Sequence, residues 1–270
     1  MKKKIWTGER LETSIQNDTT IEHLHRYGIA CSLSNGLEVL DIASGEGYGS
    51  NLLSLSSKKV IGVDISHEVI NLAKKKYVRG NLEFKEGSAT KIPIPDKSVD
   101  LVVSFETIEH HIQHEEMFEE IKRVLKSEGL LLMSSPDKKN YSDIPNYKNP
   151  FHAKELYVEE FKQLVKKHFT QANFFGQKII SGSLIIQDDE SNGFILYKGS
   201  YAKIEEVENF APVYNLCLAS NGPLPSIPAS IFDGNDINAI VLERAIKGVK
   251  SSWRYKIGNF LLSPTKFLKR

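Results

Sequence analysis

Two short runs in the first half of the chain combine residue types that could do chemistry. Asp41 to Gly47 places an acidic residue before two glycines, and Glu106 to His111 contains two carboxylates and two imidazoles. Glycines let the backbone turn sharply and let a ligand approach without a clash at Cβ. Carboxylates and imidazoles at helical spacing suit proton transfer or a divalent cation. The sequence therefore predicts a ligand-binding loop and a separate catalytic or metal-binding turn.

Acidic residues beside the first run indicate which ligand it holds. Asp41 ends one apolar run and Asp64 ends the next, so parallel strands would bring both to one edge of a sheet. A dinucleotide loop instead begins with glycine and holds a pyrophosphate at a helix N-terminus, where Asp41 would repel it. Asp41 suits an ammonium or sulfonium group, and Asp64 could accept both hydroxyls of a ribose. The pattern favours a nucleoside with a cationic tail; the alternative is a tight turn that binds nothing.

The same residues resemble the class I S-adenosylmethionine-dependent methyltransferases, strongly over residues 37–135 and more weakly as far as residue 220. The resemblance implies S-adenosylmethionine as cofactor, with its methionine part in the glycine loop and its ribose on Asp64. Ser88 stands where the family usually carries an acid near the adenine amino group, although the Ala89 amide could still serve there. The cofactor contacts expected here are Asp41, Ala43, Ser44, Gly45, Gly47, Asp64, Ile65, Ser88, Ala89 and, beside the methyl donor, Phe105.

The second run has the spacing of a metal site. If its backbone is helical, Glu106, Glu109 and His110 lie on one face, because residues three and four apart are neighbours on a helix. A fourth ligand would be His114, or His152 at the start of a helix expected as far as Lys167. Alternatively, these residues shape the cofactor pocket and perform acid–base chemistry without a metal, or they begin a solvated helix.

This run looks like that of metal-dependent O-methyltransferases, notably the small-RNA 2′-O-methyltransferases and the ubiquinone-pathway O-methyltransferases, which carry Glu-x-x-Glu-His after the fourth strand. The resemblance implies a site for Mg²⁺ or Mn²⁺, where the cation would lower the pKa of a sugar hydroxyl and orient it. With a metal, His111 or His114 would take the proton; without one, His110 is the expected general base. The implied metal ligands are Glu106, Glu109, His110 and His152.

Short apolar runs that alternate with helical patterns predict the scaffold that positions both runs. Because the runs are apolar on both faces, they fit buried parallel strands. We expect an α/β fold with a doubly wound, mostly parallel, seven-stranded sheet of the class I methyltransferase, Rossmann-like type over residues 37–222, with an insertion at about 181–212. The expected strands are Leu37–Ile42, Lys59–Asp64, Asn81–Lys85, Val99–Phe105, Gly129–Ser135, Ala172–Ile180 and Val213–Ser220. The expected helices are Tyr48–Ser56, Ser66–Val78, Glu115–Leu125, His152–Lys167 and a final one from Asp236.

Segments around this core point to the acceptor. Residues 1–36, expected as an N-terminal cap, and the run Asn149 to His152 resemble bacterial methyltransferases encoded among surface-polysaccharide genes. That resemblance implies transfer to a sugar hydroxyl in O-antigen or capsule synthesis. The alternatives are a quinone-type or other small-molecule acceptor, and a cofactor-binding module without catalysis. In the cap, Arg26 could pair with the methionine carboxylate while His25 and Tyr27 close over substrate, unless this stretch is simply a surface helix.

The composition limits the function further. The 270 residues include 35 basic and 34 acidic ones, a net charge of +1 that gives no support to nucleic-acid binding. Two cysteines are too few for a disulfide scaffold and predict a reducing compartment. The first residues lack the apolar run of a signal peptide, and no stretch approaches the roughly 20 apolar residues of a spanning helix. We therefore expect a cytoplasmic enzyme whose acceptor is a glycan or another hydroxyl-bearing small molecule.

Charge is unevenly distributed along the chain. Eight of the 35 basic residues and none of the 34 acidic ones lie at positions 244–270, which leaves 27 basic against 34 acidic residues before them. Residues 223–270 are expected to form a C-terminal extension that is basic from 244 and carries interleaved apolar residues. It could dock on the acidic body of its own or a neighbouring subunit, bind an anionic membrane or a membrane-associated glycan-assembly partner, or bind nucleic acid. Lipid binding would make the protein peripheral at the inner face of the membrane.

Overall fold

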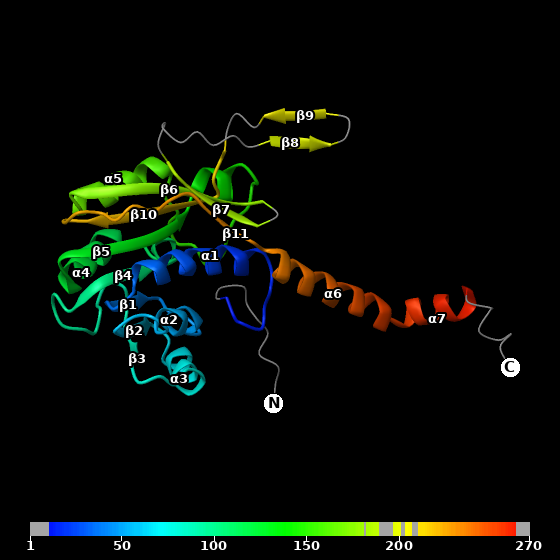
Figure 1. Cartoon of the computed structure of the whole chain (residues 1–270), viewed down its shortest axis with the longest axis horizontal. Coiled ribbons are helices and arrows are strands. Elements are labelled where there is room, and N and C mark those ends of the chain that lie inside the picture. The colour runs from blue at the N-terminus through cyan, green and yellow to red at the C-terminus, as the bar shows by residue number, and fades with distance from the viewer. Residues whose placement is uncertain (1–10, 181, 189–196, 201–202, 207–209, 263–270) are drawn as a thin grey trace.

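The computed structural model of the chain describes residues 11–180, 182–188, 197–200, 203–206 and 210–262, and its centre is a β-sheet with helices on both faces (Figure 1). Nine strands form this sheet: β1 (Glu38–Ile42), β2 (Lys59–Asp64), β3 (Leu82–Glu86), β4 (Val99–Ser104), β5 (Leu125–Pro136), β6 (Gln171–Ile179), β7 (Ser183–Gln187), β10 (Tyr214–Ser220) and β11 (Ser230–Phe232). Their order is β11-β7-β6-β10-β5-β4-β1-β2-β3. β1 to β5 pair in parallel, whereas β10 and β7 run antiparallel to their neighbours.

The seven strands predicted from the sequence are confirmed in place, but the predicted total of seven is wrong. β7 and β11 extend the described sheet beyond β6, and a separate two-stranded ribbon is formed by β8 (Tyr197–Ser200) and β9 (Lys203–Glu206). β7 lies in the segment expected as an insertion, and β11 lies in the expected C-terminal extension. Strands of three to five residues are too short for their apolar pattern to be separated from that of a loop.

Helices pack on both faces of the sheet. α1 (Asp18–Leu33) and α2 (Tyr48–Leu53) share one apolar cluster with Val39, whereas α4 (His114–Val124) and α5 (Val158–His168) share another with Leu40. Successive side chains of a strand point to opposite faces, which explains why adjacent residues of β1 enter different clusters. α3 (His67–Lys76) packs on β2 and β3 through Ile70, Ala73 and Phe84.

Helix α5 begins later than its sequence pattern predicted. The expected start was His152, but the helix begins at Val158. The backbone N–H groups of Ala153 and Lys154 donate instead to the carbonyl oxygen of Glu109, at 2.8 and 3.1 Å. These contacts draw the segment toward the end of β4, so that His152 lies in a loop beside the second polar run.

The C-terminal helices α6 (Asn235–Ser251) and α7 (Trp253–Leu262) extend away from the sheet (Figure 1). They confirm the helix expected from Asp236, with an extended residue, Ser252, between them. Among the described helices, none combines the length and the apolar composition needed to cross a membrane.

Candidate active site

A cavity of about 420 Å³ lies at the carboxyl ends of β1 to β4. Its wall contains residues of the glycine loop, of the segments after β2 and β3, and of the turn after β4. The expected site residues that line it are Ala43, Ser44, Gly45, Asp64, Ile65, Ser88, Ala89, Glu106, His110 and His111. The two polar runs of the sequence therefore face one cavity.

The glycine loop owes its shape to left-handed backbone at alternate residues. The φ angles of Ala43, Gly45 and Gly47 are 58°, 54° and 88°, values that glycine adopts without the steric cost of a Cβ. A Cβ on Gly47 would also lie 2.7 Å from Phe84 Cζ. A Cβ on Gly49 would overlap the ring of Tyr27. These glycines thus bring α2 close to the strands and leave backbone, rather than side chains, at the cavity wall.

Asp64 and the glycine loop are joined by hydrogen bonds. The Gly45 backbone N–H donates to Asp64 Oδ2 at 3.0 Å, and the Ser66 N–H donates to Oδ1 at 2.9 Å. Beside them the hydroxyl of Ser44 is buried without a hydrogen-bond partner among the described residues. A buried hydroxyl without a partner is costly unless a ligand or water supplies one. This wall therefore fits a polar ligand such as the ribose and amino-acid parts of a nucleoside cofactor.

Asp41 and Phe105 lie behind this wall, contrary to the expectation that they contact the cofactor. The Asp41 carboxylate accepts hydrogen bonds from Ser50 Oγ at 2.6 Å and from the Tyr27 hydroxyl at 3.1 Å. Burial raises the pKa of Asp41 to about 6. The Phe105 ring packs edge-on against the Tyr27 ring at 5.0 Å. Tyr27 itself lines the cavity. Asp41 and Phe105 therefore contact a residue of the cavity wall and not the cavity itself.

Arg26 was expected to pair with the methionine carboxylate, and the structure contradicts this position. Its side chain is fully buried and does not line the cavity. Nη1 lies 3.1 Å from Glu106 Oε1, Nε donates to Gln177 Oε1 at 2.6 Å, and the guanidinium covers the Tyr214 ring at 4.4 Å. Arg26 thus ties α1 to the turn after β4 and to the sheet.

His25, the neighbour of Arg26, also turns away from the cavity. Its ring nitrogens contact the hydroxyls of Ser183 and Ser230 at 2.9 and 3.0 Å. His23 and Tyr27 line the cavity instead, together with Tyr48, whose hydroxyl lies 2.8 Å from His23 Nδ1. Because His23 and Tyr27 are four residues apart on α1, helical spacing could have identified this pair from the sequence.

The turn after β4 is not the continuous helix that the metal prediction assumed. Glu106 has a φ of 50°, and helical backbone begins only with the 3₁₀ turn Ile108–His110. The Glu106 carboxylate therefore turns to Arg26 and accepts a hydrogen bond from Ser134 Oγ at 2.7 Å. It does not share a face with Glu109 and His110, which corrects its assignment as a metal ligand.

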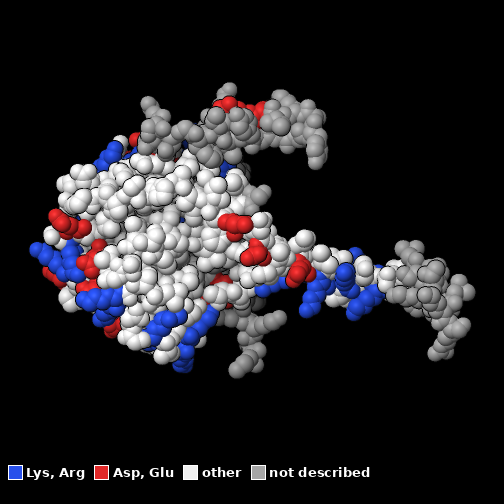
Figure 2. Space-filling model, in the orientation of Figure 1, with Lys and Arg blue, Asp and Glu red and all other residues white. Residues whose placement is uncertain are grey.

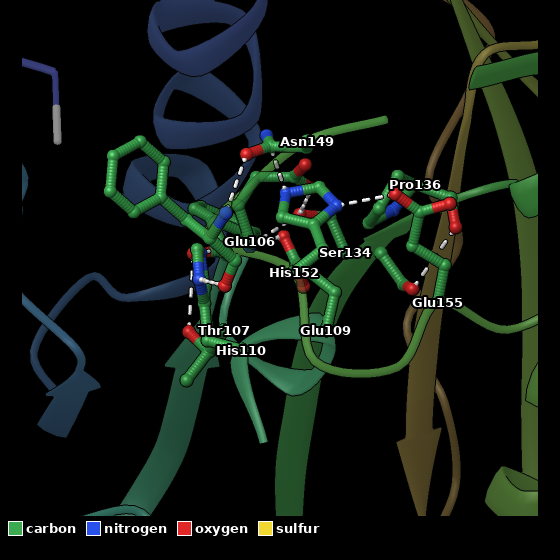
Figure 3. A network of polar contacts seen from close by, with 12 residues as sticks. Glu106, Thr107, Glu109, His110, Ser134, Pro136, Asn149, His152 and Glu155 are labelled. Carbon is green, nitrogen blue, oxygen red and sulfur yellow. Dashed lines mark hydrogen bonds and ion pairs between the residues drawn. The ribbon is translucent and has the colours of Figure 1, made fainter. Parts of the chain in front are cut away.

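Glu109, His110 and His152 converge instead (Figure 3). Each offers one potential ligand atom, and these atoms all lie within 4.8 Å of one another. The expected alternative, His114, is not in this group, because its Nε2 donates to the His111 carbonyl oxygen at 2.8 Å. The loop that precedes α5 thus supplies the histidine that completes the group of three.

The carboxyl group of Glu109 is the electrostatic centre of the trio. Its side chain is 1% exposed, and neither oxygen accepts a hydrogen bond within the described part of the chain. Burial, and then the negative charge of Glu106, raise the pKa of Glu109 well above its usual range. A buried carboxylate without donors is stable as an ion only beside a cation. The donor set of one carboxylate and two imidazoles therefore fits a divalent metal ion.

Hydrogen bonds fix which ring nitrogen of each histidine carries a proton. His110 Nδ1 donates to the Phe151 carbonyl oxygen at 3.0 Å, because a carbonyl can only accept, and its Nε2 lies 4.0 Å from Glu109 Oε1. His152 Nδ1 donates to Glu155 Oε1 at 2.6 Å, and its Nε2 accepts from Asn149 Nδ2 at 2.9 Å (Figure 3). In both neutral rings Nε2 is the basic nitrogen.

Some of these residues were not predicted, and the second expected catalytic histidine is differently placed. His111 lines the cavity, but its Nε2 faces Met117 Sδ at 3.3 Å, and burial lowers its pKa. Glu155, three residues after His152, was missed, although a carboxylate at that spacing is a common partner of a ligating histidine. Leu11 and Phe151 also line the cavity, and no local pattern indicated this.

Comparison with known proteins shows that part of this chain is similar to methyltransferases. Residues 40–133 match the family described as a methyltransferase domain. A probable S-adenosylmethionine-dependent methyltransferase of Mycobacterium tuberculosis is 34% identical over 164 residues, covering 59% of this chain and 58% of that protein. The demethylmenaquinone methyltransferase of Chlorobaculum parvum is 33% identical over 131 residues, covering 48% of this chain and 50% of that protein. The chain thus spans little more than half the length of these relatives.

The fold is shared with solved structures. The crystal structure of the YcgJ protein from Bacillus subtilis superposes with a TM-score of 0.56 at 18% identity, covering 75% of this chain and all of that one. At this identity the likeness concerns the fold. The family match extends over β1 to β4 and most of β5, and so includes the glycine loop, Asp64 and the turn from Glu106 to His111.

Proposed function

We propose that this chain, whose residues 40–133 form a methyltransferase domain with the class I fold, transfers a methyl group from S-adenosylmethionine to a hydroxyl group of its acceptor. One observation carries the proposal: a single cavity brings the glycine loop and Asp64 opposite the turn from Glu106 to His111. One half of the cavity suits a nucleoside with an amino-acid tail. The other half contains groups that can take a proton.

In the cofactor half, the chain would bind and orient the methyl donor. S-adenosylmethionine supplies an electrophilic methyl group on a sulfonium. Asp64, held by the N–H groups of Gly45 and Ser66, would accept hydrogen bonds from the ribose hydroxyls. The buried Ser44 hydroxyl offers the ligand a polar contact, and the exposed Ile65 side chain at the cavity edge offers adenine an apolar one.

In the acceptor half, His110 is the proposed general base when no cation is bound. The Phe151 carbonyl oxygen keeps the proton of the neutral ring on Nδ1, which leaves the Nε2 lone pair to accept the hydroxyl proton. The Glu109 carboxyl lies beside this ring, with Oε1 4.0 Å from Nε2. Phe151, His110 and the cofactor-binding residues line the same cavity, so proton removal and methyl transfer would occur side by side.

Glu109, His110 and His152 are the proposed ligands of a divalent cation such as Mg²⁺ or Mn²⁺. The support is the buried, unpartnered Glu109 carboxylate and the convergence of the three donor atoms. A cation there would occupy the Nε2 lone pair of His110, so His110 would act as the general base only in the absence of the cation. The cation would instead lower the pKa of the acceptor hydroxyl, whose proton would pass to water. His152 Nε2 would exchange the amide of Asn149 for this ligand role, while Glu155 continues to hold its Nδ1 proton. Glu106, paired with Arg26, is not among the proposed ligands.

The proposed acceptor is a sugar hydroxyl in surface-polysaccharide synthesis. The run Asn149 to His152 carries part of the resemblance to polysaccharide-associated methyltransferases. Phe151 lines the cavity, His152 packs against His110 of the cavity wall, and Asn149 contacts His152. Tyr141 stacks on His152, and the partly exposed rings of Tyr147 and Phe151 lie nearby. Flat aromatic faces suit the C–H face of a sugar ring. The alternative is a small-molecule acceptor of the quinone type, which the relative named demethylmenaquinone methyltransferase favours.

A transfer assay with labelled S-adenosylmethionine tests this function. Candidate nucleotide-sugars, polysaccharide fragments and demethylmenaquinone would each be incubated with the purified chain, and we expect label in the sugars. Chelation should abolish transfer, and added Mg²⁺ or Mn²⁺ should restore it, without a change in cofactor affinity measured by calorimetry. Full activity after rigorous chelation would contradict the metal site, and label in the quinone alone would contradict the sugar. Cofactor binding without transfer to any acceptor would indicate a binding module.

A further inference from the structure

From Val241 to Val249, helix α6 separates its apolar and basic residues around its axis. At about 3.6 residues per turn, Val241, Leu242, Ile246 and Val249 fall on one side, and Arg244 and Lys247 fall on the opposite side. Leu242 is 61% exposed and Val249 is 60% exposed. A helix with this division of residues is stable when another surface covers its apolar side.

The described part of the protein does not supply that surface. No residue of α6 is buried, and the helix leads away from the sheet (Figure 1). The sequence left open whether the basic extension docks on the acidic body of its own subunit, and for α6 it does not. Within the described residues, the apolar side of α6 therefore has no covering surface.

The charges of this region indicate what kind of surface would cover it. From residue 244 to residue 262 there is no acidic residue, and the basic residues are Arg244, Lys247, Lys250, Arg254 and Lys256. Figure 2 shows lysine and arginine along the outer part of α6, away from the body. Two copies of residues 244–262 would bring ten positive charges together, and the nearest acids on α6 are Asp236 and Glu243, which precede this stretch. An anionic surface would neutralise them.

Aromatic residues follow directly. Trp253 and Tyr255 begin α7 and are 67% and 42% exposed, and Ile257 is exposed one turn later. Trp and Tyr favour the boundary between lipid headgroups and acyl chains, because each joins an apolar ring to a polar group. Basic residues, an apolar helix side and interfacial aromatics together describe a helix that lies on a membrane rather than across it.

We propose that α6 and α7 bind the surface of an anionic lipid bilayer. Leu242, Ile246 and Val249 would enter the headgroup boundary, while the lysines and arginines contact lipid phosphates. The proposal concerns only these helices, and it holds whether or not the cavity transfers methyl groups.

Cosedimentation of the full chain with vesicles tests the proposal. We expect binding to phosphatidylcholine vesicles that contain about 30 mol% phosphatidylglycerol, and much weaker binding to pure phosphatidylcholine. Replacing Lys247→Gln and Lys250→Gln together should weaken anionic-vesicle binding by about tenfold or more, because each basic residue adds to the attraction. The matched control is Lys74→Gln with Lys75→Gln, an equal charge change on exposed positions of α3, which should leave binding unchanged.

The apolar side is tested separately. Leu242→Ser with Ile246→Ser should also release the chain from vesicles, and the fluorescence of the wild type, but not of Trp253→Phe, should shift to the blue when vesicles are added. Sedimentation of the protein without lipid measures its oligomeric state and tests the alternative that a second copy of the chain covers the helix. A dimer that Leu242→Ser with Ile246→Ser dissociates, together with no vesicle binding, would show that a second copy covers the helix. Tighter binding to an RNA duplex than to vesicles, or equal binding by the Lys247/Lys250 and Lys74/Lys75 variants, would also overturn the proposal.

Discussion

The cofactor half and the acceptor half of the cavity are built in different ways. Ala43, Gly45 and Asp64 belong to two successive strand ends, and their positions depend on backbone conformation and on backbone N–H groups. Glu109, His110 and His152 come from two loops that meet through side-chain and carbonyl contacts, with α1 holding Glu106 aside. Local chain geometry thus shapes nucleoside recognition, whereas the reactive groups depend on contacts between distant segments.

Replacing His110→Ala should have the largest effect and should fall on the acceptor half alone. Loss of the cation's ligand, or of the general base where no cation is bound, should lower kcat by about 10³-fold, while the Kd for S-adenosylhomocysteine stays within about twofold. Transfer rates and calorimetry measure the two quantities. His111→Ala, on the same cavity wall, should lower kcat by less than about tenfold. An equal loss in both variants would show that His110 is not the base.

Asp64→Ala should have the converse effect on the cofactor half. The ribose would lose its charged acceptor, and Gly45 and Ser66 would lose the carboxylate that their N–H groups contact. We expect the cofactor Kd to rise by about 100-fold, with kcat at saturating cofactor much less affected. Asp96→Ala removes an exposed carboxylate from the opposite edge of the sheet and serves as the control. Unchanged cofactor affinity in Asp64→Ala would remove the assigned role of this residue.

Gly49→Ala tests whether packing maintains the cofactor half. The new Cβ would overlap the Tyr27 ring, which lines the cavity and donates to Asp41. We expect the free energy of unfolding to fall by about 2–3 kcal/mol and the cofactor affinity to fall with it. Gly28→Ala on α1, where a Cβ meets no atom within 4 Å, should be neutral or slightly stabilising. If both variants unfold alike, the contact between Gly49 and Tyr27 is not important.

The smallest effect predicted is a pH dependence from the buried charges behind the acceptor half. Burial raises the pKa of Glu22 from 4.5 to about 7, so between these values the native state binds a proton that the unfolded chain has lost. The free energy of unfolding should therefore fall as pH rises from 4.5 to 7 and level off above 7.

Glu22→Gln should remove this part of the slope and be about 2 kcal/mol more stable than wild type at pH 8. The gain is smaller than the full pKa shift implies because the amide must also be buried. Chemical denaturation at several pH values measures it. Burial raises the pKa of Asp41 to about 6, so Asp41 also makes the free energy of unfolding depend on pH. This contribution is the same in wild type and in Glu22→Gln and cancels in their difference. Glu119→Gln is the exposed control, and a slope unchanged by Glu22→Gln would contradict the prediction.

The sequence anticipated seven strands of the sheet, the approximate places of α2 to α6 and much of the cofactor half. The strands, the left-handed glycine loop and the placement of Asp64 follow from apolar periodicity and from turn chemistry, both of which act over a few residues. Arg26, Asp41 and Phe105 were assigned to direct cofactor contact, but a neighbouring side chain intervenes in each case: Glu106 for Arg26, and Tyr27 for the other two. Tertiary packing decides which side chains line a cavity and which lie behind them. The spacing of residues along the sequence does not describe that packing.

The sequence by itself determined that the chain folds as an α/β sheet, that a glycine loop and two acids stand at its strand ends, and that carboxylates and histidines follow the fourth strand. These features follow from side-chain periodicity and from the conformational freedom of glycine. Only the tertiary structure decided that Glu106 leaves the metal-type group and that His152, rather than His114, completes it, since a left-handed residue breaks the expected helix and Glu109 draws in the loop before α5. Contacts between side chains from distant segments depend on how the whole core packs. The spacing of residues within one segment does not determine that packing.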